Sequence, residues 1–431
     1  MEVPLDPEAP DRAALSLHVA RVRARGGRER RPPLVLLAGG PGQSGIDMAR
    51  WLDGVLRPTL LHRDVILMDQ RGTGRSHRLA CASPSLFEAS TPAREAALAK
   101  SCAEALELDP RYFGTENVVQ DLERVRATLG LGRIALWGGS FGTRTALRYI
   151  ARFPEQVEAA VLDGVTSNER SLFRDAPRDA QASWQALLSS CRADPACAAA
   201  YPDLAANFEY LRELPSQEVT MTDPVTGAPR TTTLDGGLIS NVVRGALYIP
   251  AQRSLLPLAL HRARAGDFSA LAAMHSQTRA WASDTMALGA TLSILCSEDV
   301  DRISPNEARA AAEGSPFEDR YYRAWAASCT HWPRTKLPTD YAQRVEAELP
   351  VLLLSGALDP VTPPSHGEAL AANLPGATHL VAPQAGHGVT SYGCTPHLMG
   401  QFLRDPHEPL DGACLESTEA PPFIIEGGIV R

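Results

Sequence analysis

Short runs of apolar residues recur along the chain, and each is bounded by glycine, proline or a charged residue. Six of these runs consist mainly of Val, Ile and Leu and do not alternate with polar residues. A continuous apolar run of this kind is typical of a parallel strand whose two faces are both covered by helices. We therefore expect buried strands at 34–38, 65–69, 134–138, 159–163, 351–355 and 379–382.

Helical spacing separates these runs. Residues 116–129 place apolar side chains three or four positions apart, and Gly130 follows as a stop signal. A second helix is expected at 141–153, where Pro154 would end it. Strands that alternate with helices predict a mostly parallel, doubly wound α/β domain.

This alternation stops after Asp163. Residues 166–347 have the pattern of helices broken by proline and glycine, and the Thr-rich segment 216–233 fits either a hairpin or a loop. Strand signals resume at 351–355. The chain is therefore expected to divide into the first part of a sheet domain at 1–165, an inserted helical cap at 166–347 and the C-terminal part of the sheet domain at 348–431.

The composition changes this interpretation little. The chain has 431 residues, of which 44% are hydrophobic and 21% charged, and this is ordinary for a folded protein. A net charge of −8 argues against a nucleic-acid partner. The basic run at 21–31 is expected to be a solvated hairpin, since it lacks the interleaved aromatic residues of a single-strand binder.

The chain shows no membrane or export signal. No run reaches the roughly 20 apolar residues that a membrane-spanning helix needs. The residues after Met1 contain no apolar segment of the kind found in a signal peptide. The protein is therefore expected to be cytoplasmic, or the sequence to be that of a mature or trimmed form.

Eight cysteines bear on that choice. They fall into couples that are close in sequence, but eight cysteines allow about 105 pairings, and eight reduced thiols are an alternative. Zinc is less favoured, because the spacings are not C-x-x-C and only Cys329 has a nearby histidine, His331. Disulfides would indicate a periplasmic or secreted protein. The couples are Cys81 with Cys102, Cys191 with Cys197, Cys296 with Cys329, and Cys394 with Cys414.

A candidate nucleophile lies between a predicted strand and a predicted helix. Residues 138–142 read Gly-Gly-Ser-Phe-Gly, a G-x-S-x-G motif in the strand–turn–helix context that the motif requires. Side chains at Gly138 and Gly142 would clash with the neighbouring strand and helix. The start of a helix beneath Ser140 would favour developing negative charge.

A serine hydroxyl needs a base, and the base needs an orienting carboxylate. His387 lies in the loop after the run at 379–382, with glycines on both sides. Asp359 directly follows the run at 351–355, in a loop that prolines stiffen. Asp163 also ends a predicted strand and is the second candidate for the carboxylate.

Stabilising a tetrahedral oxyanion requires backbone N–H donors. Phe141, directly after the serine, would supply one of them. The glycine-rich loop at 38–42 would supply the other, with Gly40 as first choice and Gly39 as second, since Pro41 has no N–H. This loop is not expected to bind a nucleotide phosphate, because it has neither a P-loop lysine nor the glycine spacing of a dinucleotide-binding motif.

Three motifs together resemble the proline iminopeptidase and tripeptidyl aminopeptidase family of serine exopeptidases. They are Gly39–Gly42 (GGPG), Asp69–Ser76 (DQRGTGRS) and Gly138–Gly142 (GGSFG). The C-terminal part, from Gly356 to Gly388, is similar to the tripeptidyl aminopeptidase branch. Within the motif Asp69–Ser76, Asp69 and Arg71 are expected to brace loops and not to touch substrate.

The resemblance implies an α/β-hydrolase fold with a helical cap, and cleavage of peptides near a free N-terminus without a cofactor or metal. It implies the triad Ser140, Asp359 and His387, in the chain order of this fold. It also implies that Gly40 and Phe141 are the oxyanion donors.

The chain departs from the proline-specific members. Ala38 stands where those enzymes carry a histidine, and no match to their cap carboxylates is found. Glu298 and Asp299 are the candidates for binding the substrate's α-amine, because a protonated amine leaving water needs a carboxylate partner. The alternative is a solvated acidic loop held by Cys296. Asp163 is a weaker candidate for the same role.

Three functions remain open at this point. The first is a serine aminopeptidase whose partner is a peptide with a free N-terminus. The second is an esterase acting on small or lipid-like esters, since the same triad serves both. The third is a binding protein on the same fold, although such proteins usually lack a member of the triad.

Overall fold

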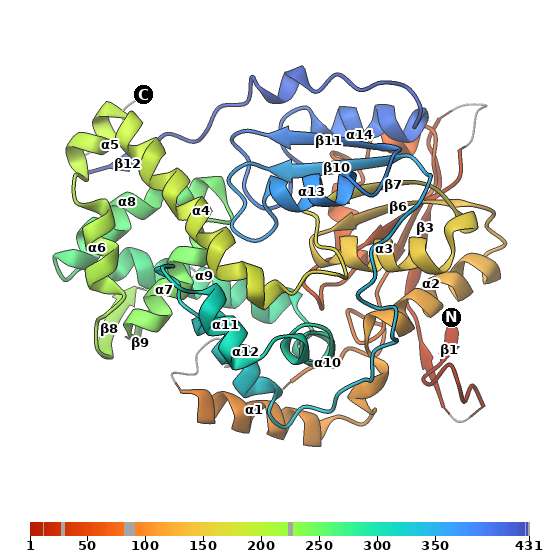
Figure 1. Cartoon of the computed structure of the whole chain (residues 1–431), viewed down its shortest axis with the longest axis horizontal. Helices are drawn as coiled ribbons and strands as arrows, with labels where there is room; N and C mark the ends of the chain where they lie inside the picture. The colour runs from red at the N-terminus through yellow and green to blue at the C-terminus, as the bar shows by residue number, and fades with distance from the viewer. Residues whose placement is uncertain (12, 27–30, 82–90, 223–226, 427, 430–431) are drawn as a thin grey trace.

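A seven-stranded sheet forms the centre of the computed structural model, which describes residues 1–11, 13–26, 31–81, 91–222, 227–426 and 428–429 (Figure 1). All six apolar runs are strands of this sheet, and these strands pair in parallel. β3 was not predicted, because it is short and only half-buried, and it pairs antiparallel with β5 at the edge. The strand order is β11 (Ala377–Ala382), β10 (Val351–Gly356), β7 (Val157–Asp163), β6 (Ile134–Gly139), β4 (Leu34–Leu37), β5 (Val65–Met68) and β3 (Val19–Val22).

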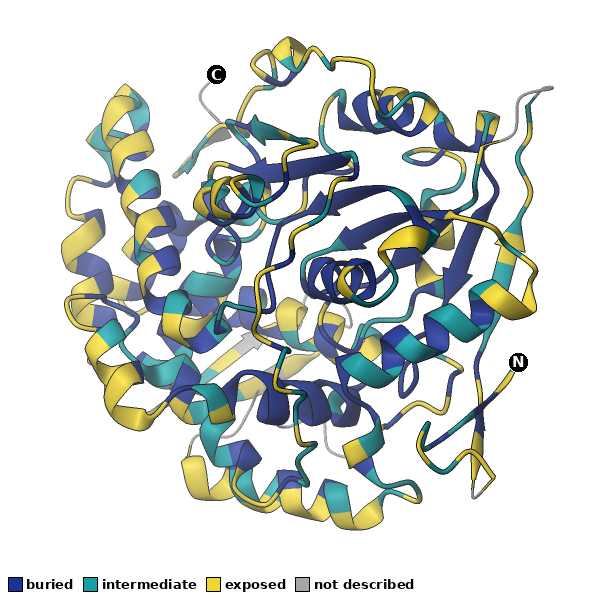
Figure 2. Cartoon of the chain, turned by 45° about the vertical axis from the view of Figure 1, so that its right-hand side comes forward, coloured by how far each residue is buried: buried dark blue, intermediate teal, exposed yellow. Residues whose placement is uncertain are grey.

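Both faces of the sheet are covered, as the continuous apolar runs predict. Along β4, Val35 and Leu37 point into one hydrophobic cluster, and Leu34 and Leu36 point into another on the opposite face. The central strands are buried along their length between layers of helices (Figure 2). The mostly parallel α/β prediction is therefore confirmed.

The first face is covered by three helices, and the second by one. The predicted helices at 116–129 and 141–153 are present, each starting and ending within a residue of the expected bounds. The covering helices are α2 (Thr115–Thr128), α3 (Phe141–Arg152) and α13 (Pro364–Ala371) on the first face and α14 (Thr395–Arg404) on the second.

A mainly helical block lies between β7 and β10, on the opposite side of the molecule from β3 (Figure 1). It has a hydrophobic core of its own, which includes Trp184, Phe208, Leu260 and Leu271. Its helices are α4 (Leu172–Ala193), α5 (Pro195–Ala200), α6 (Leu204–Leu211), α7 (Gly236–Ala246), α8 (Pro250–Arg264), α9 (Ser269–Thr285), α10 (Leu288–Glu298), α11 (Pro305–Ala311) and α12 (Arg320–Cys329).

The Thr-rich segment of this block is a hairpin and not a loop. β8 (Gln217–Thr222) pairs antiparallel with β9 (Pro229–Leu234), while residues 223–226 lie outside the described part of the chain. Residues 27–30 of the basic run also lie outside it, so the hairpin expected at 21–31 stays a prediction.

The remaining elements lie at the two ends of the chain, in short turns and in one longer helix between β5 and α2. The C-terminal segment leaves the sheet and packs against the helical block, where the Tyr201 hydroxyl donates to the Ile424 carbonyl at 3.0 Å. The elements are β1 (Glu2–Pro4), β2 (Ala14–Ser16), β12 (Ile424–Ile425), β13 (Gly428–Ile429), α1 (Pro92–Ala105), η1 (Ile46–Trp51), η2 (Thr59–Leu61), η4 (Pro110–Tyr112), η5 (Pro154–Gln156), η6 (Val300–Arg302) and η7 (Ala413–Leu415).

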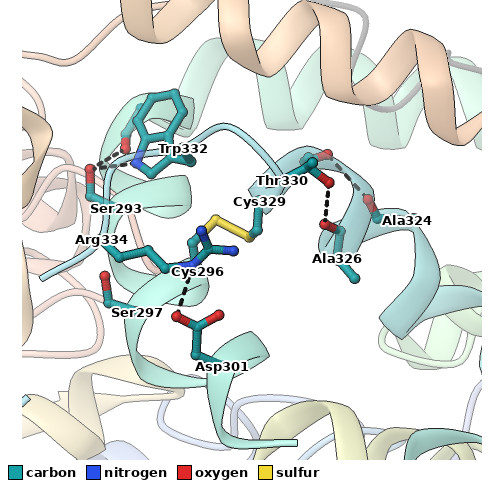
Figure 3. Close-up of a disulfide and its surroundings, with 12 residues drawn as sticks. Ser293, Cys296, Ser297, Asp301, Ala324, Ala326, Cys329, Thr330, Trp332 and Arg334 are labelled. Carbon is teal, nitrogen blue, oxygen red and sulfur yellow. Dashed lines mark hydrogen bonds and ion pairs between the residues drawn. A yellow bond between two sulfur atoms is a disulfide. The ribbon is translucent and has the colours of Figure 1, made fainter. Parts of the chain in front are cut away.

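All eight cysteines form disulfides, in the four sequence-local couples. This confirms the predicted pairing and excludes the reduced and zinc-bound alternatives. Figure 3 shows Cys296–Cys329, which joins α10 to α12 beside the ion pair of Arg334 with Asp301. Of the helices in the described residues, none is both long enough and apolar enough to cross a bilayer.

Candidate active site

Ser140 sits in a sharp turn between β6 and α3, with φ 53° and ψ −123°. This positive φ is strained for a residue with a side chain. A Cβ on Gly138 would lie 2.5 Å from the Gly142 carbonyl oxygen, and a Cβ on Gly142 would lie 2.0 Å from the Leu37 carbonyl oxygen. The glycines of the motif are therefore required by close approach of the helix and the neighbouring strand, as expected.

Asp359 and His387 meet at the same edge of the sheet, each in the loop after its strand. The imidazole Nδ1 donates to Asp359 Oδ2 at 2.8 Å. The carboxylate is fully buried, whereas the imidazole side chain is 17% exposed. Burial opposes ionisation of both groups, but their mutual attraction prevails, so the pKa of Asp359 is lowered and the pKa of His387 is raised.

Thr362 completes this pair, and sequence reasoning missed it. Its hydroxyl donates to Asp359 Oδ2 at 2.7 Å and lies 3.1 Å from His387 Nδ1. The N–H groups of Val361 and Thr362 donate to Asp359 Oδ1 at 2.8 and 2.9 Å. The available signal was a threonine three residues after an aspartate, a spacing at which the carboxylate commonly accepts bonds from the following turn.

Asp163 links the serine turn to the histidine loop without contacting the imidazole nitrogen. Its carbonyl accepts the N–H of Ser140 at 2.7 Å, and its carboxylate accepts the N–H groups of Val389 and Thr390 at 2.8 and 2.7 Å. A Cβ on the next residue, Gly164, would lie 3.4 Å from the His387 ring. Of the two carboxylates considered, Asp359 is therefore the one against the imidazole.

The glycine loop at 38–42 lies directly over the serine turn. A Cβ on Gly39 would lie 3.1 Å from the Cβ of Ser140, and Gly40 has φ 109°. Within the described residues, the N–H groups of Gly40 and Phe141 donate to no protein acceptor. Gln70 Nε2 donates to the Ala38 carbonyl at 3.1 Å, and this bond holds the loop in place.

The helical block closes over the imidazole through Tyr248, which follows α7. The Tyr248 ring meets the His387 ring edge-on at 5.2 Å, and the Tyr248 carbonyl accepts the His387 N–H at 2.9 Å. Burial raises the pKa of Tyr248 to about 12. Nothing in the sequence around residue 248 indicates this contact, because it depends on how the inserted block folds back on the sheet.

Glu298 and Asp299 lie at the far end of α10 and are buried, so they are not a solvated loop. Thr115 donates to Glu298 through its N–H and its hydroxyl, both at 2.7 Å, and Arg144 forms a two-pronged ion pair with Asp299 at 2.7 and 3.1 Å. Burial raises the pKa of Glu298. Since both carboxylates are engaged within the protein, their role in binding an amine stays a prediction.

The motif Asp69–Ser76 braces the loops around the site, as predicted. Arg71 is buried and pairs with Asp121 through two nitrogens, at 2.6 and 2.7 Å. Asp69 accepts the Ser44 hydroxyl at 2.6 Å and the Ile46 N–H at 3.0 Å.

The assembled groups suit nucleophilic chemistry. A serine hydroxyl at a helix start, a histidine held by a carboxylate, and two free N–H groups are the parts that acyl transfer uses. Among the described residues, no group of three or more His, Cys, Asp or Glu side chains is placed to hold a metal.

The chain is similar in sequence to several known peptidases. Serine protease Hip1 of Mycobacterium tuberculosis is 27% identical over 414 residues, which is 87% of this chain and 78% of the relative. The proline iminopeptidase of Neisseria gonorrhoeae is 31% identical over 31% of this chain and 32% of its own. The tripeptidyl aminopeptidase of Streptomyces lividans is 31% identical over 39% of this chain and 35% of its own.

A solved esterase from Thermogutta terrifontis is 15% identical, with a TM-score of 0.41, and covers 95% of this chain and 99% of its own. The alpha/beta hydrolase fold family matches residues 32–390, which is most of the chain. These residues contain the serine turn and the Asp359–His387 pair. The chain therefore belongs to the alpha/beta hydrolase fold family.

Proposed function

We propose that the protein is a serine peptidase in which Ser140 is the nucleophile, His387 the general base and Asp359 the orienting carboxylate. The observation that carries this proposal is the 2.8 Å bond between Asp359 and His387 at the same sheet edge as the strained Ser140 turn. Asp163 fixes the turn and the histidine loop to each other, which supports their action as one unit.

In the proposed mechanism, Ser140 attacks the scissile carbonyl as His387 takes the hydroxyl proton. The oxyanion forms beneath the free N–H groups of Gly40 and Phe141, next to the positive end of α3. His387 then gives its proton to the leaving nitrogen, and the amine departs from an acyl-enzyme on Ser140. Water attacks the acyl-enzyme in the reverse sequence of proton transfers and releases the acid.

We further propose that cleavage is directed to a free N-terminus. Relatives named proline iminopeptidase and tripeptidyl aminopeptidase support this. The contact of Tyr248 with His387 also supports it, since a helical block acting as a cap there would restrict the site to chain ends. The proposal does not rest on Glu298 and Asp299, because Thr115 and Arg144 occupy their oxygens.

The test is Ser140→Ala measured on a panel of chromogenic amides and esters. The panel contains single-residue and tripeptide amides, each with a free and a blocked N-terminus. We expect the wild type to cleave the free amides and Ser140→Ala to cleave none, while Ser216→Ala, an exposed serine in the helical block, behaves as wild type. Equal cleavage of blocked substrates would contradict N-terminal selection, and turnover by Ser140→Ala would contradict the mechanism.

We also propose that the protein works in an oxidising compartment, periplasmic or secreted. Four disulfides support this, since such bonds do not persist in a reducing cytosol. Intact mass measured without reduction, on protein taken from separated cell fractions, tests it. Eight free thiols in native protein from the cytosolic fraction would contradict it.

A further inference from the structure

Arg244 is a cation in the helical block that has no carboxylate partner in the described part of the chain. It lies in the last turn of α7, is partly exposed, and has its guanidinium 4.1 Å from the centre of the Tyr321 ring and 5.7 Å from that of Tyr248. Its Nε is shielded from solvent and has no acceptor among the described residues, where Arg244 also forms no ion pair.

Tyr248 places this cation beside the candidate active site. The centre of the Tyr248 ring lies 5.7 Å from the guanidinium of Arg244 and 5.2 Å from the centre of the His387 ring. A single aromatic ring therefore separates Arg244 from the imidazole. Burial, and to a smaller extent the charge of Arg244, act to lower the pKa of His387 against the pull of Asp359. The two side chains therefore lie within electrostatic range of each other.

The buried arginines of the described residues have carboxylate, carbonyl or hydroxyl partners, whereas Arg244 is partly exposed. Arg63 pairs with Glu158 at 2.5 Å, and Arg71 and Arg144 pair with aspartates. Arg253 lacks a carboxylate, but the carbonyl and the hydroxyl of Ser183 accept its hydrogen bonds at 3.1 Å. Arg244 has Tyr248 and Tyr321 in place of a carboxylate. The faces and hydroxyls of these rings offset part of its desolvation, while its Nε has no acceptor among the described residues.

We propose that Arg244 binds a carboxylate of the substrate, on the leaving-group side of the scissile bond. A guanidinium presents a planar fork of donors that matches a carboxylate, and a partly dehydrated cation without a counter-ion favours an anion over a protonated amine. His387 delivers its proton to the leaving nitrogen, so the space beside the imidazole belongs to the residue that departs. This inference rests on the proposed peptidase function.

Peptides carry carboxylates in two places: the C-terminus of a short substrate, and an Asp or Glu side chain next to the cleaved bond. The first would make the enzyme select short peptides, and the second would make it select acidic residues. Both present the same chemistry to Arg244. Substrate pairs that differ in one of these carboxylates at a time separate them.

The experiment compares kcat/KM within such pairs for the wild type, Arg244→Gln and Arg264→Gln. One pair has a free or an amidated C-terminus directly after the leaving residue, and the other has Glu or Gln as the leaving residue in a longer peptide. Arg264 is the matched control, because it lies 3.9 Å from the centre of the Tyr210 ring on an exposed part of α8.

We expect the wild type to prefer the carboxylate in at least one pair by about 10- to 100-fold, the range of a charge-assisted bond. Arg244→Gln should bring that ratio close to one, and Arg264→Gln should leave it as in the wild type. The pair that responds identifies which carboxylate is bound. An unchanged ratio in Arg244→Gln, or no preference in either pair, overturns the inference.

Two further measurements keep this result independent of catalysis and folding. Labelling of Ser140 by a fluorophosphonate shows whether Arg244→Gln retains an assembled site. Calorimetric binding of the same peptide pairs to Ser140→Ala, with and without Arg244→Gln, tests the carboxylate contact without turnover. If the fluorophosphonate fails to label Ser140 in the wild type, the proposed function is contradicted. If Ser140→Ala with an intact Arg244 binds both peptides of each pair equally, only the inference about Arg244 is contradicted.

Discussion

At the scale of single residues, the imidazole of His387 is held by two neighbours. Asp359 accepts its Nδ1–H at 2.8 Å, and the ring of Tyr248 meets the imidazole ring edge-on at 5.2 Å. The carboxylate fixes the tautomer that leaves Nε2 free to accept a proton. Burial acts against the charged imidazole, and the net raised pKa of His387 shows that the aspartate outweighs it.

This balance predicts how activity depends on pH. A general base must be neutral, so kcat/KM should fall on the acid side below the raised pKa of His387, at a pH above the ordinary histidine value of 6.5. Asp359→Asn removes the charge that raises this pKa, so the acid limb should move to lower pH. The same change should reduce kcat by about 10³- to 10⁴-fold, because the tautomer is no longer fixed.

Thr362→Val is the control for that prediction. It removes one hydrogen bond to Asp359 but keeps the carboxylate charge, so the acid limb should move less than in Asp359→Asn. The measurement is kcat/KM from about pH 5 to pH 9 for the three proteins, a range that brackets the histidine pKa. An acid limb at the same pH in Asp359→Asn and wild type would show that His387 is not the titrating base.

The sequence points to polar residues after strand ends but not to their neighbours in the helical block. Ser140, Asp359 and His387 were proposed because each lies in a turn or loop after an apolar run, and the ends of parallel strands meet at one sheet edge. Tyr248 and Arg244 carry no such signal, since no periodicity tells which turn of an inserted helix folds over the sheet. Their positions depend on contacts between segments that are distant in the chain, Tyr248 with His387 and Arg244 with Tyr321.

At the scale of elements, the unit β6–turn–α3 depends on glycines that touch backbone. Gly142→Ala would place a Cβ 2.0 Å from the Leu37 carbonyl oxygen, so β4 and α3 must separate. We expect a loss of about 3 kcal/mol or more in the free energy of unfolding, as for severe overpacking. The matched change is Gly245→Ala in α7, where a Cβ meets nothing within 4 Å and should add about 0.5–1 kcal/mol.

Urea denaturation midpoints of the two glycine variants check this prediction. If Gly142→Ala loses stability and Gly245→Ala gains it, the contact of the new Cβ with the Leu37 carbonyl oxygen causes the loss, and not the replacement of glycine in itself. Equal effects in the two variants would contradict the packing seen at the serine turn.

Helix α10 gives a second prediction at this scale, because Asp299 at its end is paired with Arg144 of α3. Both side chains are fully buried, so Asp299→Asn leaves an unpaired buried charge and should cost about 3–5 kcal/mol in the free energy of unfolding. Asp301→Asn is the control, since Asp301 is 45% exposed in its pair with Arg334 and should change stability by under about 1 kcal/mol.

The same two variants test the sequence prediction that Asp299 binds the substrate's amine. If Asp299 is structural, Asn should lower stability and leave the ratio of kcat/KM for free and blocked substrates as in the wild type. If it binds the amine, that ratio should fall toward one. Thermal denaturation and the substrate panel, measured on the same preparations, distinguish the two outcomes.

At the scale of the whole molecule, the sequence predicted six of the seven strands of the sheet and the mainly helical pattern between β7 and β10, because the two have different hydrophobic periods. It could not predict how the inserted block is attached. Thr291 of α10 donates to the Pro41 carbonyl at 2.6 Å, so the block contacts the glycine loop over the serine, while Cys296–Cys329 joins the same helix to α12 (Figure 3).

The last prediction compares two disulfides of this block by the length of chain each one closes. Cys296 and Cys329 are 33 residues apart in sequence, whereas Cys191 and Cys197 are 6 apart, so the first bond restricts the unfolded chain more. Replacing both cysteines of a pair by serine should therefore cost about 1–2 kcal/mol more at Cys296–Cys329 than at Cys191–Cys197. Denaturant unfolding of the two double variants measures the difference.

Because α10 also supports the glycine loop through Thr291, loss of the longer-range bond should reduce kcat as well, and loss of the shorter one should not. Equal losses of stability, with no change of kcat in either variant, would show that α10 holds its place over the serine by packing alone.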